Sequence, residues 1–543
     1  MGGHGPASRE KGECMGITQP RLAANTEFGV RRSNTILLLI LLAAGLCSAL
    51  HAVSKPFWYD EMCTVIVCRL PSASVVWNAL SNAADSNPPF FYLILRLTRH
   101  LVPADHLGYR LPSILGLLGT VSCIYIILSR RVDRLSALVG ATFVLCTPLA
   151  SYAYEARPYA MLLGCISCAI LAWQRIDDSR LYSLLVALAL AAAVSLHYYA
   201  VLVWPVFVIA EASVWVFHRR FRIGAWAAFV VGALPLLFFA KLLLNLRQYY
   251  GQHFWEHTSI GQLFLVHDWL FNVSGYWGWT FAVGITAIFA YLGITNTELL
   301  GWSDQRQAKE SVLPVEEQVL ILMLLWLPII AFVVAIVSHG MMGRYMLPTV
   351  LGGALAVGYL TGKVPTALRT LLLMLLLMTY GLSSVSVVKS ALQGSLLEPR
   401  AAATRQVQAI VAEYSESGLP IIISSGFRYL PMAYYAPAGA NRTLYAVADP
   451  RAAATFTGTD SIDLDLLVLR RYFPLQVEEY ADFVSRHREF FLVSDPRGDF
   501  DWLPARLLHD GHTLKLLSAG TTTVYKVTLS PLLSAAPVRE LKR

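Results

Sequence analysis

The amino-acid sequence predicts a mainly α protein, a polytopic bundle of about 11 to 13 transmembrane helices followed by a small soluble α/β domain. Of the 543 residues, 56% are hydrophobic and only 14% are charged, whereas soluble domains carry about 25% charged residues. The mean hydropathy is +0.53, and apolar runs of about 20 residues recur along the chain. After Lys389 the composition becomes mixed and polar, which indicates a second domain.

The N-terminal segment is polar and basic. We expect residues 1–32 to form a disordered cytoplasmic tail, because most of their charges are arginine and lysine. The first apolar run begins near Thr35 and lacks a small-residue cleavage site. It therefore predicts an uncleaved first span.

The transmembrane domain is expected to cover residues 33–390. Its clearest apolar segments lie at 35–53, 109–128, 135–152, 158–174, 181–196, 198–217, 223–243, 276–295, 318–337, 344–361 and 367–388. A further segment, 89–102, is shorter and is interrupted by Arg96 and Arg99. Element boundaries read from one sequence are uncertain by several residues.

The loops between these segments differ in charge, which predicts their sidedness. Basic loops near residues 130–134, 175–180, 218–222, 306–309 and 363–369 are expected in the cytoplasm. The intervening loops, and the first loop at 54–88, then face outward. When crossings are counted forward from a cytoplasmic N-terminus, a single crossing at 89–102 would place the basic loop 130–134 outside, against its charge. Either this segment is re-entrant or interfacial, or a further crossing lies within 62–84, and the sequence leaves both open.

The C-terminal segment 395–530 predicts a small soluble α/β domain on the outer face. Short β-like runs lie at 420–425, 466–469, 490–494 and 521–529, and helical patterns lie at 401–417 and 476–488. The segment contains no G-x-G-x-x-G or Walker loop, so it predicts no nucleotide site.

Charge and cysteine content exclude two other classes of function. The formal charge of +8 comes from bases in short loops between apolar runs, which indicates topology signals and no nucleic-acid partner. Cys165 and Cys168 form a C-x-x-C pattern, but they lie inside an apolar helix. The cysteines therefore predict neither a metal site nor a disulfide framework.

The outer loop 54–88 carries the most informative acids. Asp60 and Glu61 directly follow an aromatic triplet, 57–59, of the kind found at membrane interfaces. Asp85 lies shortly before Asn87 and a Pro-Pro pair. Carboxylates held at the membrane boundary can meet a substrate whose tail lies in lipid. This is the central hypothesis for the function.

Polar residues in the other outer loops are candidates to bind that substrate. They are Glu155, Arg157, His197, Arg344 and Tyr345, together with the Tyr-, Trp- and His-rich loop 245–275. Ionisable groups at the bilayer edge are costly unless they are paired or hydrated. The two arginines are therefore either structural partners of nearby acids or ligands of a lipid-linked phosphate, whose oxygens match the guanidinium fork.

Several motifs in this order resemble the GT-C glycosyltransferases, in the branch of the lipid A aminoarabinose transferases and the protein O-mannosyltransferases. The motifs are Trp58-Tyr59-Asp60-Glu61, residues 85–92, residues 109–113, residues 155–159 and residues 343–348. The resemblance covers roughly residues 35–390. It implies an integral membrane enzyme that takes a sugar from a polyprenyl-phosphate donor on the outer face, with inversion. Many relatives carry His or Lys just before the Pro-Pro pair, where this chain has Asn87.

The leading hypothesis is therefore glycosyl transfer. Asp60 is expected to be the catalytic base, with Asp85 and Glu61 as further catalytic candidates. Arg157 and Arg344 are expected to stabilise the departing phosphate. The other expected substrate-binding residues are Tyr345, Asn87, Glu155 and His197. The acceptor is left open as a lipid, a glycan or a protein.

Two alternatives share the membrane topology. A transporter or flippase of lipid-linked sugars would carry ionisable residues near the centre of its spans, and a polysaccharide polymerase or ligase is poorly separated by sequence. The cofactor is also left open. A divalent metal between Asp60 or Asp85 and a histidine of 245–275 is one alternative. We expect a multi-pass protein of the bacterial inner membrane, with the surrounding lipids as partners.

Overall fold

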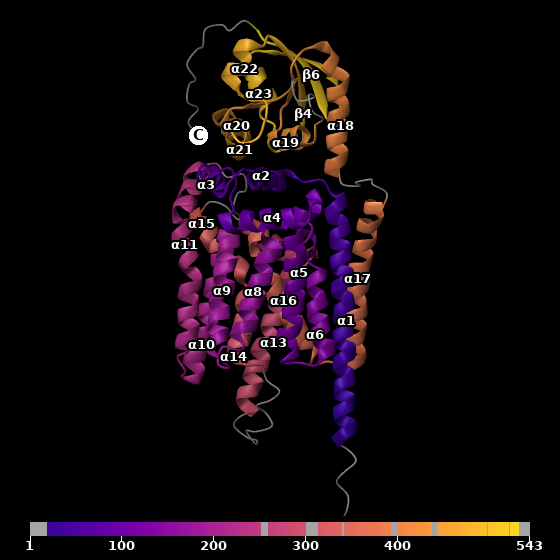
Figure 1. The fold of residues 1–543 in the computed structure, drawn as a ribbon, viewed down its shortest axis with the longest axis vertical. Coiled ribbons are helices and arrows are strands. Elements are labelled where there is room, and N and C mark those ends of the chain that lie inside the picture. Colours follow the sequence, from indigo (N-terminus) through magenta and orange to yellow (C-terminus); the bar gives the residue numbers. More distant parts are fainter. Residues whose placement is uncertain are drawn as a thin grey trace, which may run out of the picture.

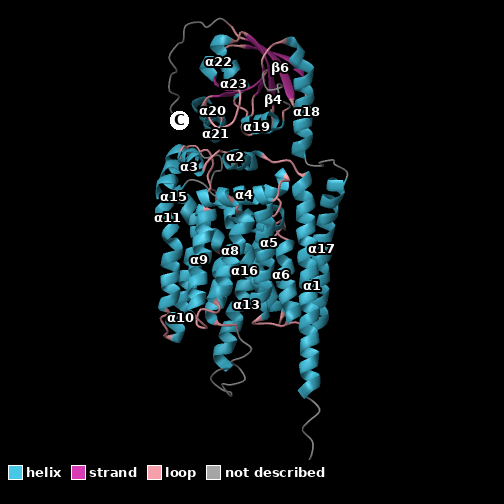
Figure 2. Ribbon diagram, in the orientation of Figure 1, coloured by secondary structure: helices cyan, strands magenta, loops and turns pink. Residues whose placement is uncertain are grey.

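The computed structural model describes residues 19–250, 253, 259–299, 313–338, 342–392, 399–436, 443–496, 498–520 and 522–530. A bundle of long helices forms one part of the molecule, and a smaller domain with a β-sheet lies beyond one end of it (Figures 1 and 2). The predicted class, a mainly α membrane bundle with a C-terminal α/β domain, is confirmed.

The bundle is built from the apolar segments that the sequence marks. In the described part of the chain, five helices are long and apolar enough to cross a membrane, and the bent pair α14 and α15 makes a sixth. Five shorter apolar helices accompany them. The bundle elements are α1 (Gln19–Ser54), α5 (Asp105–Ser129), α6 (Arg134–Leu145), α7 (Leu149–Tyr152), α8 (Tyr159–Trp173), α9 (Arg180–Leu196), η1 (Tyr198–Val203), α10 (Trp204–His218), α11 (Ile223–Tyr250), α13 (Trp277–Leu299), α14 (Val315–Leu325), α15 (Leu327–Ser338), η3 (Gly343–Met346), α16 (Thr349–Thr361) and α17 (Thr366–Leu392).

Two helix boundaries have local causes. The bend of 50° between α14 and α15 falls just before Pro328, which has no backbone N–H to donate. Helix α1 begins at Gln19, so the expectation of a fully disordered tail was wrong for residues 19–32. Pro20 fits the first turn of that helix, where no intrahelical donor is needed, and the apolar first span continues it.

The structure shows how the segment whose crossing was uncertain, residues 59–101, is arranged. Its helices α2 (Tyr59–Cys68), α3 (Ala73–Ser81) and α4 (Pro89–Leu101) lie across the outer end of the bundle (Figure 1). Helix α4 has 13 residues, which span about 20 Å and are too few to cross a bilayer. Arg96 on α4 donates to the carbonyls of Cys68 and Leu70. Segment 89–102 therefore lies across the end of the bundle, together with α2 and α3, which make up most of 62–84.

The C-terminal domain is a six-stranded mixed sheet with the strand order β3-β2-β1-β4-β6-β5. The first four strands in that order are parallel to one another. Strand β6 pairs antiparallel with both of its neighbours, β4 and β5. The strands are β1 (Ile421–Ile423), β2 (Leu444–Ala448), β3 (Val477–Glu479), β4 (Glu489–Ser494), β5 (Thr513–Ser518) and β6 (Thr523–Thr528). The helices are α18 (Pro399–Tyr414), α19 (Gly426–Tyr435), α20 (Pro450–Thr457), α21 (Ser461–Leu469), α22 (Tyr480–Arg486) and α23 (Leu503–His509).

Some local predictions for this domain were wrong. The expected strand 466–469 is the end of α21, where Ile462, Leu466 and Leu469 form a buried helical stripe. The expected helix 476–488 begins instead with β3 and becomes helical at Tyr480. In the outer loop 245–275 the structure has helix α12 (Ile260–Leu270), which was not expected.

The C-terminal domain packs directly on the outer segment. The ring of Phe427 on α19 stacks on the ring of Tyr59 on α2, with centroids 4.9 Å apart. The backbone N–H of Phe57 donates to the hydroxyl of Tyr435 at 2.8 Å. One continuous hydrophobic cluster joins buried residues of both regions, such as Met62 and Tyr429. The domain thus covers the loop that carries the predicted acids.

Candidate functional site

The first turn of α2 presents its two acids in different directions. Asp60 and Glu61 occupy adjacent helical positions, which lie about 100° apart around a helix axis. The carboxylate of Glu61 also accepts from the backbone N–H of Trp58 at 3.3 Å, as acids at helix N-termini commonly do.

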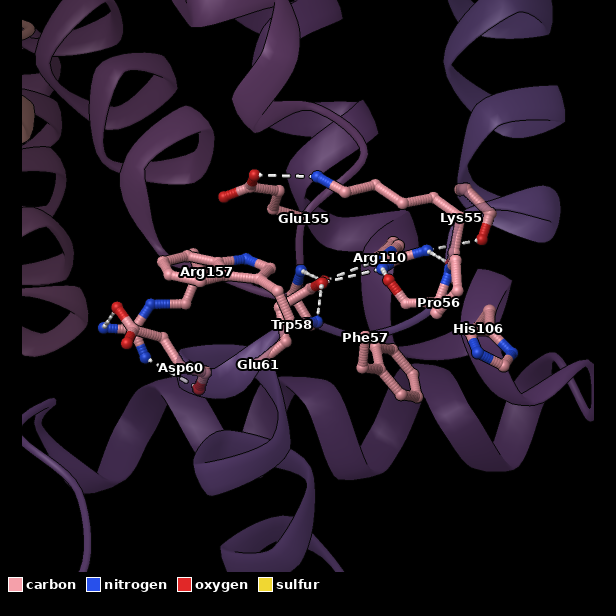
Figure 3. A network of polar contacts seen from close by, with 12 residues as sticks. Lys55, Pro56, Phe57, Trp58, Asp60, Glu61, His106, Arg110, Glu155 and Arg157 are labelled. Atoms are coloured by element: carbon pink, nitrogen blue, oxygen red, sulfur yellow. Dashed lines mark hydrogen bonds and ion pairs between the residues drawn. The ribbon is translucent and has the colours of Figure 1, made fainter. Parts of the chain in front are cut away.

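Glu61 belongs to a buried structural network (Figure 3). Arg110 donates to both of its carboxylate oxygens, at 2.8 and 2.7 Å, and Ala156 N–H donates to Oε1 at 2.6 Å. The side chains of Glu61 and Arg110 have no exposed area. Burial opposes ionisation, but the Arg110 guanidinium outweighs it and holds the pKa of Glu61 below its ordinary value. The carboxylate therefore joins α2 to α5 and to the start of α8.

Asp60 faces away from this network, toward two arginines. Its Oδ2 lies 2.9 Å from Nη1 of Arg344 and 3.8 Å from Nη2 of Arg157. Arg157 Nη1 also donates to the Asp60 carbonyl at 3.2 Å. About 20% of the Asp60 side chain is exposed, so substrate can reach this acid.

Asp85 completes the charged cluster. Its Oδ1 lies 3.6 Å from Nη1 of Arg157, and its Oδ2 accepts from the hydroxyl of Thr64 at 2.7 Å. Burial opposes the charged form of the arginine, but Asp85 and Asp60 outweigh it and raise the pKa of Arg157 above its ordinary value. The structure therefore brings together Asp60, Asp85, Arg157 and Arg344, which the sequence placed in three separate loops.

Local sequence positions both arginines at the outer end of the bundle. Arg157 precedes Pro158 and α8, and its carbonyl accepts from the hydroxyl of Ser113 at 2.9 Å. Arg344 lies in the short 3₁₀ turn η3. A side chain at Gly343 would approach the ring of Trp269 to 3.3 Å, so glycine lets this turn pass close to that ring.

Several buried polar atoms in the cluster have no hydrogen-bond partner among the described residues. They are Nε of Arg157, Nε of Arg344, both amide atoms of Asn87 and the hydroxyl of Tyr159. Only 1% of Asn87 is exposed. Buried polar groups are nearly always satisfied by protein, water or ligand. This concentration of unused donors and acceptors is therefore typical of a site that binds a polar ligand.

Aromatic side chains form the wall beside Arg344. Tyr345 stacks on Tyr199 with ring centroids 4.0 Å apart, and the ring of His197 lies 5.2 Å from that of Tyr345. His197 Nδ1 accepts from the N–H of Tyr199 at 3.2 Å. Burial, with the charges of Arg157 and Arg344, lowers the pKa of His197 to about 3. The imidazole is therefore neutral, and it orders the wall of the site.

Glu155 lies outside the charged cluster. Its Oε1 accepts from Nζ of Lys55 at 3.1 Å (Figure 3), so Arg157 does not pair with this neighbour. Burial raises the pKa of Glu155 above its ordinary value although Lys55 opposes the shift. Its Oε2 is buried and has no hydrogen-bond partner among the described residues, and the role of Glu155 in substrate binding stays a prediction.

One cavity adjoins the cluster. It has a volume of about 350 Å³ and is lined by Arg344, Tyr152 and Trp269. A second cavity of about 660 Å³ lies between α1, α7, α12 and α17, and residues with hydroxyl groups, such as Ser151, line its wall. The two cavities share the lining residues Leu265 and Trp269.

The expected metal site has no ready ligand set in the described ranges. No group of three His, Cys, Asp or Glu side chains there is arranged to hold a metal ion. His253 pairs with Asp460 at 3.1 Å, and Nε2 of the buried His267 donates to the Leu325 carbonyl at 3.1 Å. His257 lies outside the described residues.

The sequence also missed residues that the structure places here. Arg110 was within an expected span, where a buried arginine is itself a signal of a paired acid. Asp465, on α21 of the C-terminal domain, contacts Tyr59 on α2 and Tyr250 on α11. The sequence offers little indication of this contact. An acid within the apolar run 461–469 is equally typical of a strand or helix with one exposed face.

Comparisons with known proteins give structural matches only. No protein-family model matches the chain, and no curated protein matches its sequence. The crystal structure of ArnT from Cupriavidus metallidurans in the apo state matches with a TM-score of 0.55 and 14% identity, covering 91% of this chain and 98% of that chain. The structure of ArnT bound to undecaprenyl phosphate matches with a TM-score of 0.52 and 12% identity, covering 90% and 97%. The fold expected from the resemblance is thus confirmed, and the chain has the fold of ArnT.

Proposed function

We propose that the chain is a membrane glycosyltransferase, which moves a sugar from a polyprenyl-phosphate donor to an acceptor hydroxyl on the outer face. The observation that carries this proposal is the buried cluster of Asp60, Asp85, Arg157 and Arg344 at the outer end of the bundle. Asp60 remains accessible, and both arginines keep an unused Nε. The fold is that of ArnT, one structure of which holds undecaprenyl phosphate.

The arginines suit the phosphate of the donor. A guanidinium can present two N–H groups to phosphate oxygens in a fork, and Nε is a free member of that fork in both Arg157 and Arg344. Asn87, two residues after Asp85 in the sequence, supplies an amide that has no hydrogen-bond partner among the described residues. The cavity beside Arg344 would receive the phosphate, and the larger adjoining cavity would receive the start of the lipid tail.

Donor binding would also prepare the base. Arg344 is paired with Asp60 at 2.9 Å. A phosphate that attracts Arg344 competes with that pair, so the Asp60 carboxylate becomes available to an acceptor. Asp85 keeps its contacts with Thr64 and Arg157, and therefore holds the second arginine in place.

The reaction follows from these positions. The acceptor oxygen attacks the anomeric carbon while the bond from that carbon to the phosphate oxygen breaks, with inversion. Asp60 takes the proton of the acceptor hydroxyl. Arg157 and Arg344 stabilise the negative charge of the departing polyprenyl phosphate. A lipid phosphate is already a good leaving group, so the reaction needs no nucleotide.

The distribution of charge favours this proposal over a transporter. Transport of charged lipids would be expected to use ionisable groups near the centre of the spans. Among the described residues of the bundle, the charged cluster lies near helix ends instead, and so does the pair of Arg131 and Glu317 on the opposite side. We place the protein in a bacterial inner membrane, with the C-terminal domain outside.

The direct test is an assay on membranes that contain the protein. Radiolabelled polyprenyl-phosphate sugars are supplied as donors, and transfer to lipid, glycan and protein fractions is measured. Transfer that depends on the protein, and on Arg344, is expected. Movement of intact donor across sealed vesicles without sugar transfer would instead support the flippase alternative.

A further inference from the structure

Asp465 brings a carboxyl group of the C-terminal domain to the edge of the site. It lies on α21, and its Oδ2 accepts from the hydroxyl of Tyr59 at 3.4 Å. Its Oδ1 is hydrogen-bonded to the hydroxyl of Tyr250 on α11. Tyr59 directly precedes Asp60 on α2. Asp465 therefore contacts the helix that carries the proposed base and also the end of a transmembrane helix.

The hydrogen-bond arrangement indicates a protonated carboxyl. The hydroxyl of Tyr250 lies 2.7 Å from the carbonyl of Ala83 and also contacts Asp465. A tyrosine hydroxyl has one proton, and a carbonyl can only accept. If Tyr250 donates to Ala83, the remaining bond is complete only when Asp465 donates its own proton to the tyrosine oxygen.

The surrounding charges favour the same state. The titratable groups that interact with Asp465 are Tyr59, Asp60 and Cys63 of α2, Asp85 of the segment after α3, and Tyr249 and Tyr250 of α11. Burial, together with the charges of Asp85 and Asp60, raises the pKa of Asp465 from 3.8 to about 7, although the hydroxyls of Tyr250 and Tyr59 lower it. An ionised Asp465 would be repelled by both of these acids.

We propose that Asp465 is a positioning residue of the site, which as a neutral carboxyl clamps the C-terminal domain onto α2 and α11 and releases it on losing its proton. Clamping fixes α2, and with it the direction of Asp60. Release loosens the cover of the site on the side from which an acceptor arrives. The role in transfer rests on the proposed function, whereas the clamp itself does not.

The sign of the pH dependence follows from proton linkage. The docked domain binds the Asp465 proton more tightly than a released domain, in which the carboxyl is exposed and has its ordinary pKa. Docking is therefore strongest below the ordinary pKa and weakens as pH rises from about 4 to about 7. The expected change is about tenfold in the docking equilibrium for each pH unit in that window. Above about pH 7 no further change is expected from this group.

Hydrogen–deuterium exchange of the full-length protein in lipid nanodiscs tests the clamp without donor or acceptor. Wild type and Asp465→Asn are compared at each pH from 5 to 8, so that the intrinsic pH dependence of exchange cancels. Asparagine is neutral at every pH and can still donate to Tyr250. We expect exchange in α21 and α2 of the wild type to rise relative to the variant between pH 5 and 7, while Asp465→Asn stays docked.

Two controls isolate Asp465. Asp482→Asn changes an exposed acid on α22, and its pH response should match the wild type. The pair of His253 and Asp460, 3.1 Å apart, also joins the two regions. The comparison is therefore repeated in an Asp460→Asn background, where the difference due to Asp465 should remain.

The outcomes separate the clamp from the enzyme. If Asp465→Asn shows the same pH response as the wild type, the proposal is overturned. If that variant does not fold, Tyr250→Phe is used, which removes the oxygen that accepts the Asp465 proton. It should weaken docking at pH 5 and flatten the pH response, and an unchanged response would also overturn the proposal. A protein that shows the clamp but transfers no sugar would contradict the proposed function alone.

Discussion

Arg157 contacts both acids of the charged cluster, Asp60 and Asp85. It contacts Asp85, the side chain and carbonyl of Asp60, and the hydroxyl of Thr64. Removing one partner from such a buried charge network leaves the others uncompensated. Arg344 differs, because it contacts only Asp60 within the cluster and lines an open cavity. The two arginines should therefore respond differently to substitution.

Arg344→Lys tests the phosphate contact. Lysine keeps the charge but loses the planar fork, so affinity for undecaprenyl phosphate should fall about 10- to 100-fold, as for loss of a charge-assisted hydrogen bond. The yield of folded protein in detergent should stay near that of the wild type. Arg69→Lys, at an outer ion pair with Asp105, is the matched control and should bind the lipid normally. Normal lipid binding with a reduced folded yield would assign Arg344 a structural role.

At the scale of elements, Glu61 and Arg110 join helices that are distant in sequence. Arg110 on α5 also donates to the carbonyls of Ala52 and Lys55 at the end of α1, at 2.7 and 2.6 Å. The pair therefore fixes the angle at which the chain leaves the first span and enters α2. This geometry sets where Asp60 points.

Glu61→Gln should destabilise the protein strongly. The amide leaves Arg110 without its counter-charge, and breaking a buried pair typically costs about 3 to 5 kcal/mol. We expect a clearly lower unfolding temperature in detergent. Glu155→Gln is the matched control, since its partner Lys55 is about 10% exposed and the loss should be smaller. A fully stable Glu61→Gln protein without activity would restore Glu61 as a catalytic candidate.

The sequence predicted the site where short-range signals were strong. Asp60, Arg157 and Arg344 each stand beside an aromatic or proline residue, and Asp85 lies three residues before Pro88, so their place near the ends of apolar segments could be predicted directly. Their mutual distances could not, because they depend on how the bundle packs. The contact of Asp465 was hidden for the same reason. It joins residues about 400 positions apart, and no local pattern encodes such a contact.

At the scale of the whole molecule, the proposed function requires the site to lie on the outer side of the membrane. Helix α2, which carries Asp60, and the C-terminal domain lie at one end of the bundle (Figure 1), and the described basic loops, near 130–134, 175–180, 218–222 and 363–369, lie at the other. The positive-inside rule then places the site outside the cytoplasm. In the proposed reaction, a polyprenyl-phosphate donor would therefore present its sugar on the outer leaflet.

Single cysteines at positions 220 and 451 test this orientation. Both native residues are exposed arginines, so Arg220→Cys and Arg451→Cys should fold. An impermeant thiol reagent applied to intact cells should label position 451 and spare position 220. After the membrane is made permeable, both should react, which controls for accessibility. The reverse pattern would invert the topology and remove the basis for an outer-face enzyme.

The most direct test of the central claim is the turnover of Asp60→Asn. The substitution keeps the size of the side chain and removes its basicity, so transfer from a polyprenyl-phosphate sugar should fall about 10²- to 10⁴-fold. Lipid binding and the unfolding temperature should remain close to those of the wild type, and Asp105→Asn should transfer normally. Near-wild-type turnover by a well-folded Asp60→Asn protein would contradict the account and exclude Asp60 as the base.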